Sequence, residues 1–510
     1  MRLACTWRLG RYSSLSLMWE GIQLGLGVAL QWQYLLYLVG GCVVGTFIGL
    51  LPGLGPMTAI AIMIPVASAL EPAAGIIMMA AVYYGAIFGG STSAILINAP
   101  GVASTVATSF DGYPLARQGK AGKALAIAAI ASFAGGLMGA LLLVLVGPAL
   151  ATISLSFQST DYFALMVMGL VCIAAFSNES GFAKAILMTC VGIMLSTVGT
   201  DQTQGIPRFT LGHIDLLDGI SFLLIVMSTF ALAEALMGVL KPENGTRKNV
   251  DKYDLDVSKE ELKQTAPPIA RSSILGFVIG LLPGAGATIA SLLGYASEQR
   301  LSRANETPKF GDGSIKGVAA PEAANNAAAT GSFVPLLSLG IPGSGTTAIL
   351  LGAFIAYGIQ PGPMLYVAEP EVFWSVIVSM WLGNLVLLCI NLPLIPYIAR
   401  LLLVPKHILL PCVMFLCLFG VYLTSFNPFD LYLMILFAVV AVFLRLAQFP
   451  MAPLVLGFIL GGLIEENLRR ALLIYDHSWS FLWQRPTTAV ILLLTVVILI
   501  WPLWRQNRQK

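Results

Sequence analysis

The chain has 510 residues, of which 57% are hydrophobic and 10% are charged, and its formal net charge is +3. Soluble domains carry about 25% charged residues, so this composition excludes a soluble enzyme or binding module and indicates a protein that lives in membrane lipid. The net charge is small, and the Lys and Arg residues are scattered through loops. Both facts argue against nucleic acid as a partner and against a polybasic lipid anchor.

The N-terminal segment, residues 1–33, holds only a weak first span at about 15–31. Three arginines in its first eleven residues resemble the start of a signal peptide. The apolar stretch that follows is interrupted by Glu20 and Gln23 and has no clean cleavage site, so we do not favour that interpretation. Met18 is an alternative start, which would make residues 1–17 a translation artefact.

Long apolar runs predict an all-α integral membrane protein with about 10–12 transmembrane helices. Runs at 34–51, 124–146, 220–240 and 489–504 approach or reach the length of about 20 residues that a spanning helix needs. A transmembrane barrel would instead show segments of alternating polarity.

An internal repeat divides the chain. G-T-F-I-G-L-L-P-G-L-G at 45–55 returns as G-F-V-I-G-L-L-P-G-A-G at 276–286, 231 positions later, and L-I-N-A-P-G at 96–101 is followed 242 positions later by S-L-G-I-P-G at 338–343. Such repeats are typical of secondary transporters. We therefore expect a first repeat half at 34–240, a cytoplasmic hydrophilic linker at 241–268, a second repeat half at 269–464 and a C-terminal segment with the last span at 465–510.

Each half contains two predicted helix breaks, at 52–56 and 98–103 and at 283–286 and 342–345. Proline and glycine at these places interrupt a helix and allow a turn. We expect a re-entrant hairpin and then a discontinuous helix in each half. Basic loops at 117–123, 300–316 and 400–406 should face the cytoplasm. Four spans between Lys123 and Lys241 satisfy this rule, and the count predicts that the two repeats are inverted.

Unwound backbone at membrane depth is costly unless it is buried in protein or lines a wet cavity. New helix N-termini at the breaks offer free N–H groups and partial positive charge, which suits an anionic substrate. The alternative is that small residues only let helices pack closely. The candidate substrate-binding residues around the breaks are Gly53, Gly55, Ser91, Thr92, Ser93, Asn98, Gly101, Gly284, Gly286, Gly343, Ser344, Thr346 and Thr347.

Glu322, Asn325 and Asn326 are the candidate coupling-ion residues, and neutral oxygens at Asn325 and Asn326 could hold Na⁺. An acid inside the membrane indicates function. Alternatively, Glu322 follows Pro321 and could stabilise the first turn of a helix. The three histidines are scattered, so no catalytic residue or His-based metal site is expected. No phosphate-binding loop for ATP occurs, and we expect no cofactor, with a Na⁺ or H⁺ gradient as the energy source.

Several long motifs also carry a family resemblance. They are G-L-L-P-G-L-G-P, Y-G-A-I-F-G-G-S-T-S-A-I-L-I-N-A-P-G, D-G-Y-P-L-A-R-Q-G-K-A, A-A-P-E-A-A-N-N-A and P-L-L-S-L-G-I-P-G-S-G-T-T-A. In this order, over about residues 34–470, they resemble the large membrane subunit of tripartite tricarboxylate transporters. The resemblance implies a subunit of the bacterial inner membrane that imports a carboxylate. Its implied partners are a small four-span membrane subunit and a periplasmic solute-binding protein.

The sequence also allows two other functions. A channel would also use unwound backbone, as a filter, and a membrane scaffold would need no coupled transport. For a transporter, the sequence does not distinguish an elevator motion from rocking, Na⁺ from H⁺, a monomer from a homodimer, or one carboxylate from another.

Overall fold

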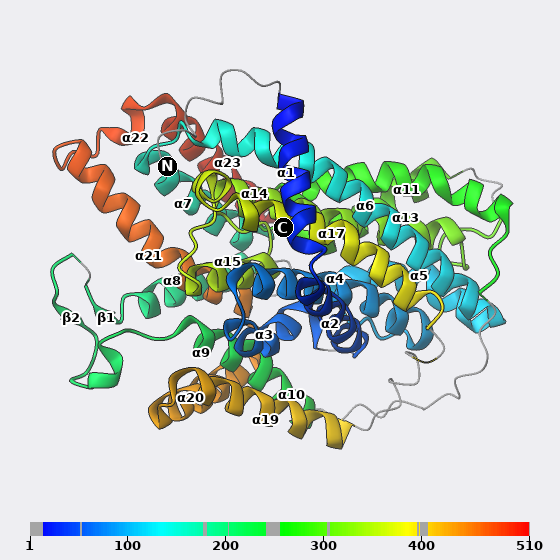
Figure 1. The fold of residues 1–510 in the computed structure, drawn as a ribbon, viewed down its shortest axis with the longest axis horizontal. Coiled ribbons are helices and arrows are strands. Elements are labelled where there is room, and N and C mark those ends of the chain that lie inside the picture. The colour runs from blue at the N-terminus through cyan, green and yellow to red at the C-terminus, as the bar shows by residue number, and fades with distance from the viewer. Residues whose placement is uncertain are drawn as a thin grey trace.

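The computed structural model describes residues 14–51, 54–176, 181–201, 203–240, 255–302, 307–394, 397 and 406–508, and almost all of them are helical (Figure 1). The N-terminal part contains α1 Ser14–Ala29, α2 Trp32–Leu50, α3 Gly55–Ser68, α4 Pro72–Ile97, η1 Ala103–Thr105, α5 Val106–Leu115, η2 Ala116–Lys120, α6 Ala121–Ser154, α7 Ser159–Phe176, α8 Phe182–Ser196, β1 Gly199–Thr200, β2 Pro207–Arg208, η3 Ile214–Leu216, α9 Phe222–Val226, η4 Met227–Leu232 and α10 Ala233–Leu240.

The C-terminal part contains α11 Lys259–Gly280, α12 Gly286–Leu301, α13 Ile315–Gly331, α14 Phe333–Leu339, α15 Gly345–Ala356, α16 Pro363–Ala368, α17 Pro370–Asn391, α19 Lys406–Ser425, α20 Pro428–Leu446, α21 Met451–Ile474, α22 Phe481–Gln484 and α23 Pro486–Arg508. Across the described chain, proline begins α4, α16, α17, α20 and α23, at a position where its missing N–H costs nothing. Two segments, η2 and η4, are π-helices.

The helix α11 begins earlier than the sequence predicted. Ser258 and Glu261 form a reciprocal capping box at its N-terminus, so residues 259–268 of the predicted linker belong to this helix. Residues 241–254 of that linker lie outside the described part of the chain. Pro267 and Pro268 lie inside α11, and the helix continues through them.

Glycines bring α2 against α4 and α11 against α13. A Cβ atom at Gly49 would lie 2.1 Å from the carbonyl oxygen of Ala86, and one at Gly280 would lie 2.4 Å from that of Ala328. Gly45 on Val82 and Gly276 on Ala324 repeat this arrangement. Each glycine of α2 lies 231 positions before its counterpart in α11, and each partner residue in α4 lies 242 positions before its counterpart in α13. These numbers are the two offsets of the sequence repeat. The repeat is therefore also a repeat of packing.

The two halves interlock around α4 and α13. The first-half helix α6 packs on α13, and its second-half counterpart α17 packs on α4. The hairpin helices exchange neighbours in the same way, since α12 contacts η1 and α3 contacts α15. Every residue from Gly317 to Gly331 of α13 is buried, and so is most of α4. These two helices form the centre of the molecule.

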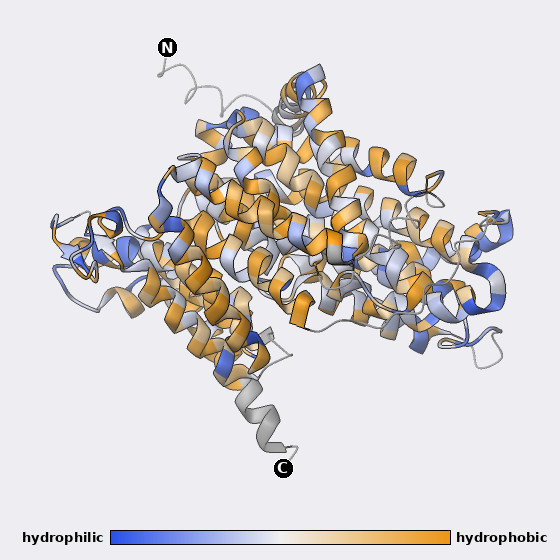
Figure 2. Ribbon diagram, turned by 90° about the horizontal axis from the view of Figure 1, so that it is seen from below, coloured by the Kyte–Doolittle hydropathy of each residue, from blue (hydrophilic) through white to orange (hydrophobic). Residues whose placement is uncertain are grey.

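Within the described residues, eight helical stretches are long and apolar enough to cross a bilayer, and five shorter apolar helices accompany them. The predicted count of about 10–12 included shorter helices such as α7 and α8, with 18 and 15 residues. Figure 2 shows hydrophilic ribbon mainly at the two ends of the long axis, with hydrophobic helices between them. The chain is an all-α, multi-pass membrane protein.

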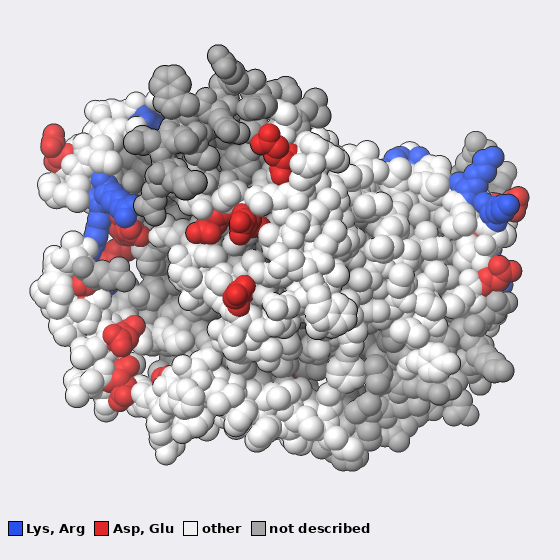
Figure 3. All heavy atoms as spheres, viewed as in Figure 1, with Lys and Arg blue, Asp and Glu red and all other residues white. Residues whose placement is uncertain are grey.

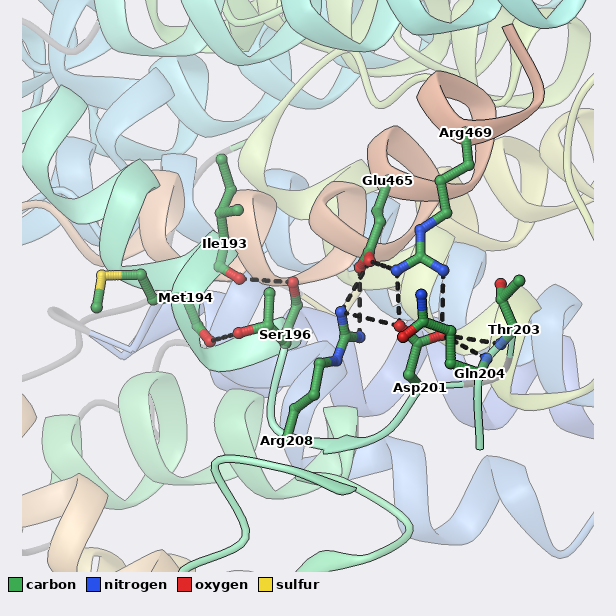
Figure 4. A network of polar contacts seen from close by, with 10 residues as sticks. Ile193, Met194, Ser196, Asp201, Thr203, Gln204, Arg208, Glu465 and Arg469 are labelled. Atoms are coloured by element: carbon green, nitrogen blue, oxygen red, sulfur yellow. Dashed lines mark hydrogen bonds and ion pairs between the residues drawn. The ribbon is translucent and has the colours of Figure 1, made fainter. Parts of the chain in front are cut away.

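A loop with the antiparallel pair β1–β2 projects at one end of the molecule (Figure 1). Arg469 on α21 holds it, because its guanidinium donates to both carboxylate oxygens of Asp201, at 3.1 and 2.6 Å (Figure 4). Arg469 also bonds Glu465, which in turn accepts from Arg208 at 2.8 Å. The pKa of Asp201 is lowered, chiefly by the Arg469 hydrogen bond and then by the Thr203 N–H. The network fixes the loop to the end of α21.

Candidate functional site

All four predicted helix breaks are present. The described structure interrupts helices between α2 and α3, between α4 and η1, between α11 and α12, and between α14 and α15. Pro52 and Gly53 of the first break lie outside the described residues. Gly55 and Gly286, 231 positions apart, open α3 and α12 with φ of +57° and +61°. Only glycine adopts this backbone freely, so α3 and α12 begin with the same backbone conformation.

The breaks lie next to one another. The Gly284 N–H donates to the Gly343 carbonyl oxygen at 3.0 Å and joins the two breaks of the second half. In the first half, a Cβ atom at Gly101 would lie 1.8 Å from the Gly49 carbonyl oxygen. Across the halves, a Cβ atom at Gly345 would lie 3.0 Å from the Met57 sulfur. The N-termini of α3, α12 and α15 therefore meet in one region, with the second break beside them.

Each central helix bonds the break of the other half. Asn325 on α13 donates to the Ser104 carbonyl oxygen at 3.3 Å. Tyr83 on α4 places its hydroxyl within hydrogen-bonding reach of Ser344 and Thr346, and also of Ser332. Tyr83 and Asn325 are 242 positions apart, as are Ser104 and Thr346. Tyr83 and Asn325 thus occupy the same position of the repeat. They differ in side chain, but each contacts the break region of the opposite half.

Glu322 lies in the middle of α13 and is fully buried. Its Oε2 atom accepts from Ser91 at 2.7 Å and from Ser132 at 2.8 Å, and its Oε1 atom accepts from Thr108. These hydroxyls come from α4, α6 and α5, so one carboxylate joins four helices. The prediction that Glu322 stabilises a helix first turn is wrong, because α13 begins seven residues earlier, at Ile315, and continues through Pro321.

Asn325 and Asn326 contact each other beside Glu322. The Asn326 amide donates to the Asn325 Oδ1 atom at 2.7 Å and to the Glu322 backbone carbonyl at 3.0 Å. Both side chains are buried. The three predicted coupling-ion residues are therefore adjacent, although the Asn325 oxygen already has a protein partner.

The remaining predicted substrate residues lie at the breaks in several roles. Ser344 and Thr347 cap α15 reciprocally. Asn98 is exposed and ends α4 in the left-handed conformation, and Ser93 donates to the Gly90 carbonyl oxygen. A Cβ atom at Gly343 would lie 2.8 Å from Ser332. The buried hydroxyls Ser91 and Thr92 line a small cavity instead of a break.

Sequence reasoning missed Tyr83, Thr108 and Ser132, which the structure places at this centre. The 242-residue offset contained the signal for Tyr83, because it aligns Tyr83 with Asn325. No comparable signal marks Thr108 or Ser132, since single hydroxyls in apolar helices usually bond their own backbone.

Another carboxylate, Asp111 of α5, is fully buried and holds the loop before α13. It accepts from the backbone N–H groups of Gly311, Gly313 and Ser314 at 2.7–2.9 Å and from the Tyr295 hydroxyl. A Cβ atom at Gly317 would lie 2.0 Å from this carboxylate. Asp111 therefore fixes the start of α13 and with it the depth of Glu322.

A sequence model of the Tripartite tricarboxylate transporter TctA family matches residues 35–456. Two proteins of Agrobacterium vitis are similar to the chain. One, described as "Uncharacterized 52.8 kDa protein in TAR-I ttuC' 3'region", is 42% identical over 495 residues, which are 96% of this chain and 98% of that protein. The other, "Uncharacterized protein in TAR-II ttuC' 3'region", is 43% identical over 236 residues, 46% of this chain and 96% of that protein. No solved structure matches the chain.

Proposed function

Because this chain belongs to the TctA family of tripartite tricarboxylate transporters, we propose that it is the large transmembrane subunit of a secondary transporter that imports a carboxylate. The observation that carries the proposal is the meeting of the helix breaks in one region, where one break of each half contacts the central helix of the opposite half. A site built from both halves can change its accessibility when the halves move relative to each other.

The chemistry of the breaks supports an anionic substrate. The N-termini of α3, α12 and α15 bring partial positive charge and N–H groups to one region. Hydroxyl groups of Ser344, Thr346 and Tyr83 lie beside them. These groups would replace water around carboxylate oxygens, with Gly55, Gly286 and Gly343 allowing the backbone to come close.

The proposed energy source is an ion gradient of Na⁺ or H⁺. Glu322, Asn325 and Asn326 form a buried polar group on α13, a central helix whose neighbours come from both halves. An ion bound there would act on the contact between Asn325 and the break at Ser104. Ion binding and substrate access would then be coupled through one helix.

We place the subunit in the bacterial inner membrane, with inverted repeats, a small four-span subunit and a periplasmic solute-binding protein as partners. In Figure 3, Lys and Arg gather at both ends of the long axis, and Asp and Glu lie at these ends as well as between them. The basic loop at 117–123 lies against the N-terminal part of α11, since Lys123 pairs with Glu261 at 2.6 Å. The positive-inside rule therefore favours a cytoplasmic α11 end. An elevator motion and a rocking motion both suit this arrangement, and a homodimer is a further proposal.

The function is tested by uptake of radiolabelled citrate and other di- and tricarboxylates into cells that contain this subunit, the small subunit and the binding protein. We expect saturable uptake that needs the binding protein and collapses when the ion gradients are dissipated. Substitution of Asn326 by Leu or Thr346 by Val should abolish it while leaving membrane insertion intact. Normal uptake by both variants would contradict the site. Uptake without saturation and without the binding protein would support a channel.

A further inference from the structure

A small cavity lies between α4, α6 and α17, next to the hydroxyls that bond Glu322. It has a volume of about 10 Å³ and its polar lining consists of Ser91, Thr92, Ser132 and Asn391, with apolar side chains completing the wall. A volume of this size suits one water-sized particle.

Asn391, at the end of α17, has an unpaired oxygen at this cavity. Its amide nitrogen donates to the Leu387 carbonyl oxygen at 3.0 Å, while its Oδ1 atom has no hydrogen-bond partner among the residues that the structure describes. The side chain is only 3% exposed. Rotating the amide by half a turn would bring Oδ1 against the Leu387 oxygen, so the observed orientation is the favourable one. A buried acceptor without a partner is costly and indicates that something else supplies one.

The other oxygens of the cavity present lone pairs. Ser91 and Ser132 both donate their hydroxyl protons to Oε2 of Glu322, at 2.7 and 2.8 Å. Their protons therefore point to the carboxylate, and their lone pairs remain for a ligand. The carboxyl group of Glu322 lies directly behind two of the lining oxygens. With Glu322 ionised, this cavity suits a cation, because neutral oxygens would make the contacts and the negative charge would lie one hydrogen bond away.

We propose that this cavity binds one small monovalent cation, Na⁺, through Asn391, Ser91, Ser132 and Thr92, with Glu322 as the neutralising charge. As a coupling-ion site, the proposal rests on the proposed function. It moves the predicted Na⁺ position away from Asn325 and Asn326, because the Asn325 oxygen is already bonded by the Asn326 amide. Cation binding would tie α17 to the carboxylate that joins α4, α5, α6 and α13.

The test uses the purified full-length chain in lipid nanodiscs and measures thermal unfolding in NaCl, KCl and choline chloride at equal ionic strength. A ligand that binds only the folded chain raises the unfolding temperature. We expect Na⁺ to raise it over choline in the native chain. In Asn391→Leu, the Na⁺ concentration for half the effect should rise by roughly tenfold or more.

Asn384→Leu is the matched control. Asn384 lies on the same helix, is equally buried and donates to the Met380 carbonyl in the same way, but it does not line the cavity. This variant should keep the native Na⁺ response. Asn391→Asp adds a charged ligand and should strengthen the Na⁺ response. This second variant tests the site even where Asn391→Leu folds poorly.

Two results overturn the site. One is the absence of any Na⁺-specific effect on the native chain, which would leave water as the occupant, and the other is an equal Na⁺ response of Asn391→Leu and Asn384→Leu. Failure of the proposed function is distinguishable, because it would show as missing carboxylate uptake in a chain that Na⁺ still stabilises.

Discussion

Asn98 and Gly340, 242 positions apart, end α4 and the equivalent segment α13–α14 in the same left-handed conformation, with φ of 52° and 71°. The first half uses asparagine where the second uses glycine. The two positions differ in their surroundings, since Asn98 is exposed and a Cβ atom at Gly340 would lie 2.5 Å from the Pro361 carbonyl oxygen. This position therefore accommodates a side chain in the first half, whereas the second half leaves no room for one.

Gly340→Ala should lower the free energy of unfolding by about 1–3 kcal/mol, because it adds both backbone strain and a steric clash. Asn98→Gly removes strain at the equivalent place and should be neutral within about 0.5 kcal/mol. Thermal unfolding of the two purified variants compares them. Equal losses in both would show that the crowding at Gly340 is unimportant.

Gly49→Ala and Gly280→Ala should each destabilise the chain by about 1–3 kcal/mol, because the added methyl group forces α2 from α4, or α11 from α13. Gly40 on α2 has nothing within 4 Å of its Cβ direction. Gly40→Ala should therefore be neutral or stabilise slightly. Unfolding midpoints of the three variants check the pairing, and a harmless Gly280→Ala would argue against the repeated packing.

Tyr83→Phe should reduce carboxylate uptake by roughly tenfold or more, as expected when a buried hydrogen bond worth about 1.4 kcal/mol is lost. The neighbouring Tyr84 provides the control, because its buried hydroxyl has no hydrogen-bond partner within the described part of the chain. Tyr84→Phe should leave uptake unchanged and stability equal or higher. Both variants are measured by initial uptake rates at equal amounts of membrane-inserted protein, and an unaffected Tyr83→Phe would remove that residue from the site.

Glu322→Leu should destabilise the chain by about 2–4 kcal/mol, since three buried hydroxyls lose their acceptor at about 1 kcal/mol each. Glu322→Gln keeps one acceptor oxygen and should lose about half as much. Both should lack ion-driven uptake if the carboxylate serves the coupling ion. Denaturation and uptake are measured on the same preparations, and a fully active Glu322→Gln would make the residue structural only.

The acid sensitivity of the projecting loop follows from Asp201. Since its folded pKa is lowered, ionised Asp201 stabilises the folded chain above its unfolded pKa of about 3.9, and this stabilisation is lost as the pH falls toward the folded pKa. The unfolding temperature of Asp201→Asn should thus fall less steeply than that of the native chain between about pH 5 and pH 3. Asp218→Asn, exposed in the same loop, removes the same charge as a control. Parallel curves for all three proteins would contradict the prediction.

The sequence alone predicted the parts of the fold that local chemistry determines. Proline and glycine marked all four breaks, and the offsets of 231 and 242 identified the repeated segments. It did not predict which side chains meet across helices. Ser132 reaches Glu322 from 190 residues away, and Asn391 reaches the same region from α17. These contacts between helices depend on how the two halves pack against each other. The spacing of residues along one helix carries no information about that packing.

The burial of α13 has a consequence for biogenesis. This helix carries a carboxylate and two amides, and it is not among the helices apolar enough to cross a bilayer unaided. A translocon would release such a segment into lipid only at a high cost. Its partners α4, α5 and α6 are synthesised about 200 residues earlier. They are therefore already in the membrane when α13 leaves the ribosome. The order of the two halves along the gene thus lets the earlier half receive the polar helix of the later one.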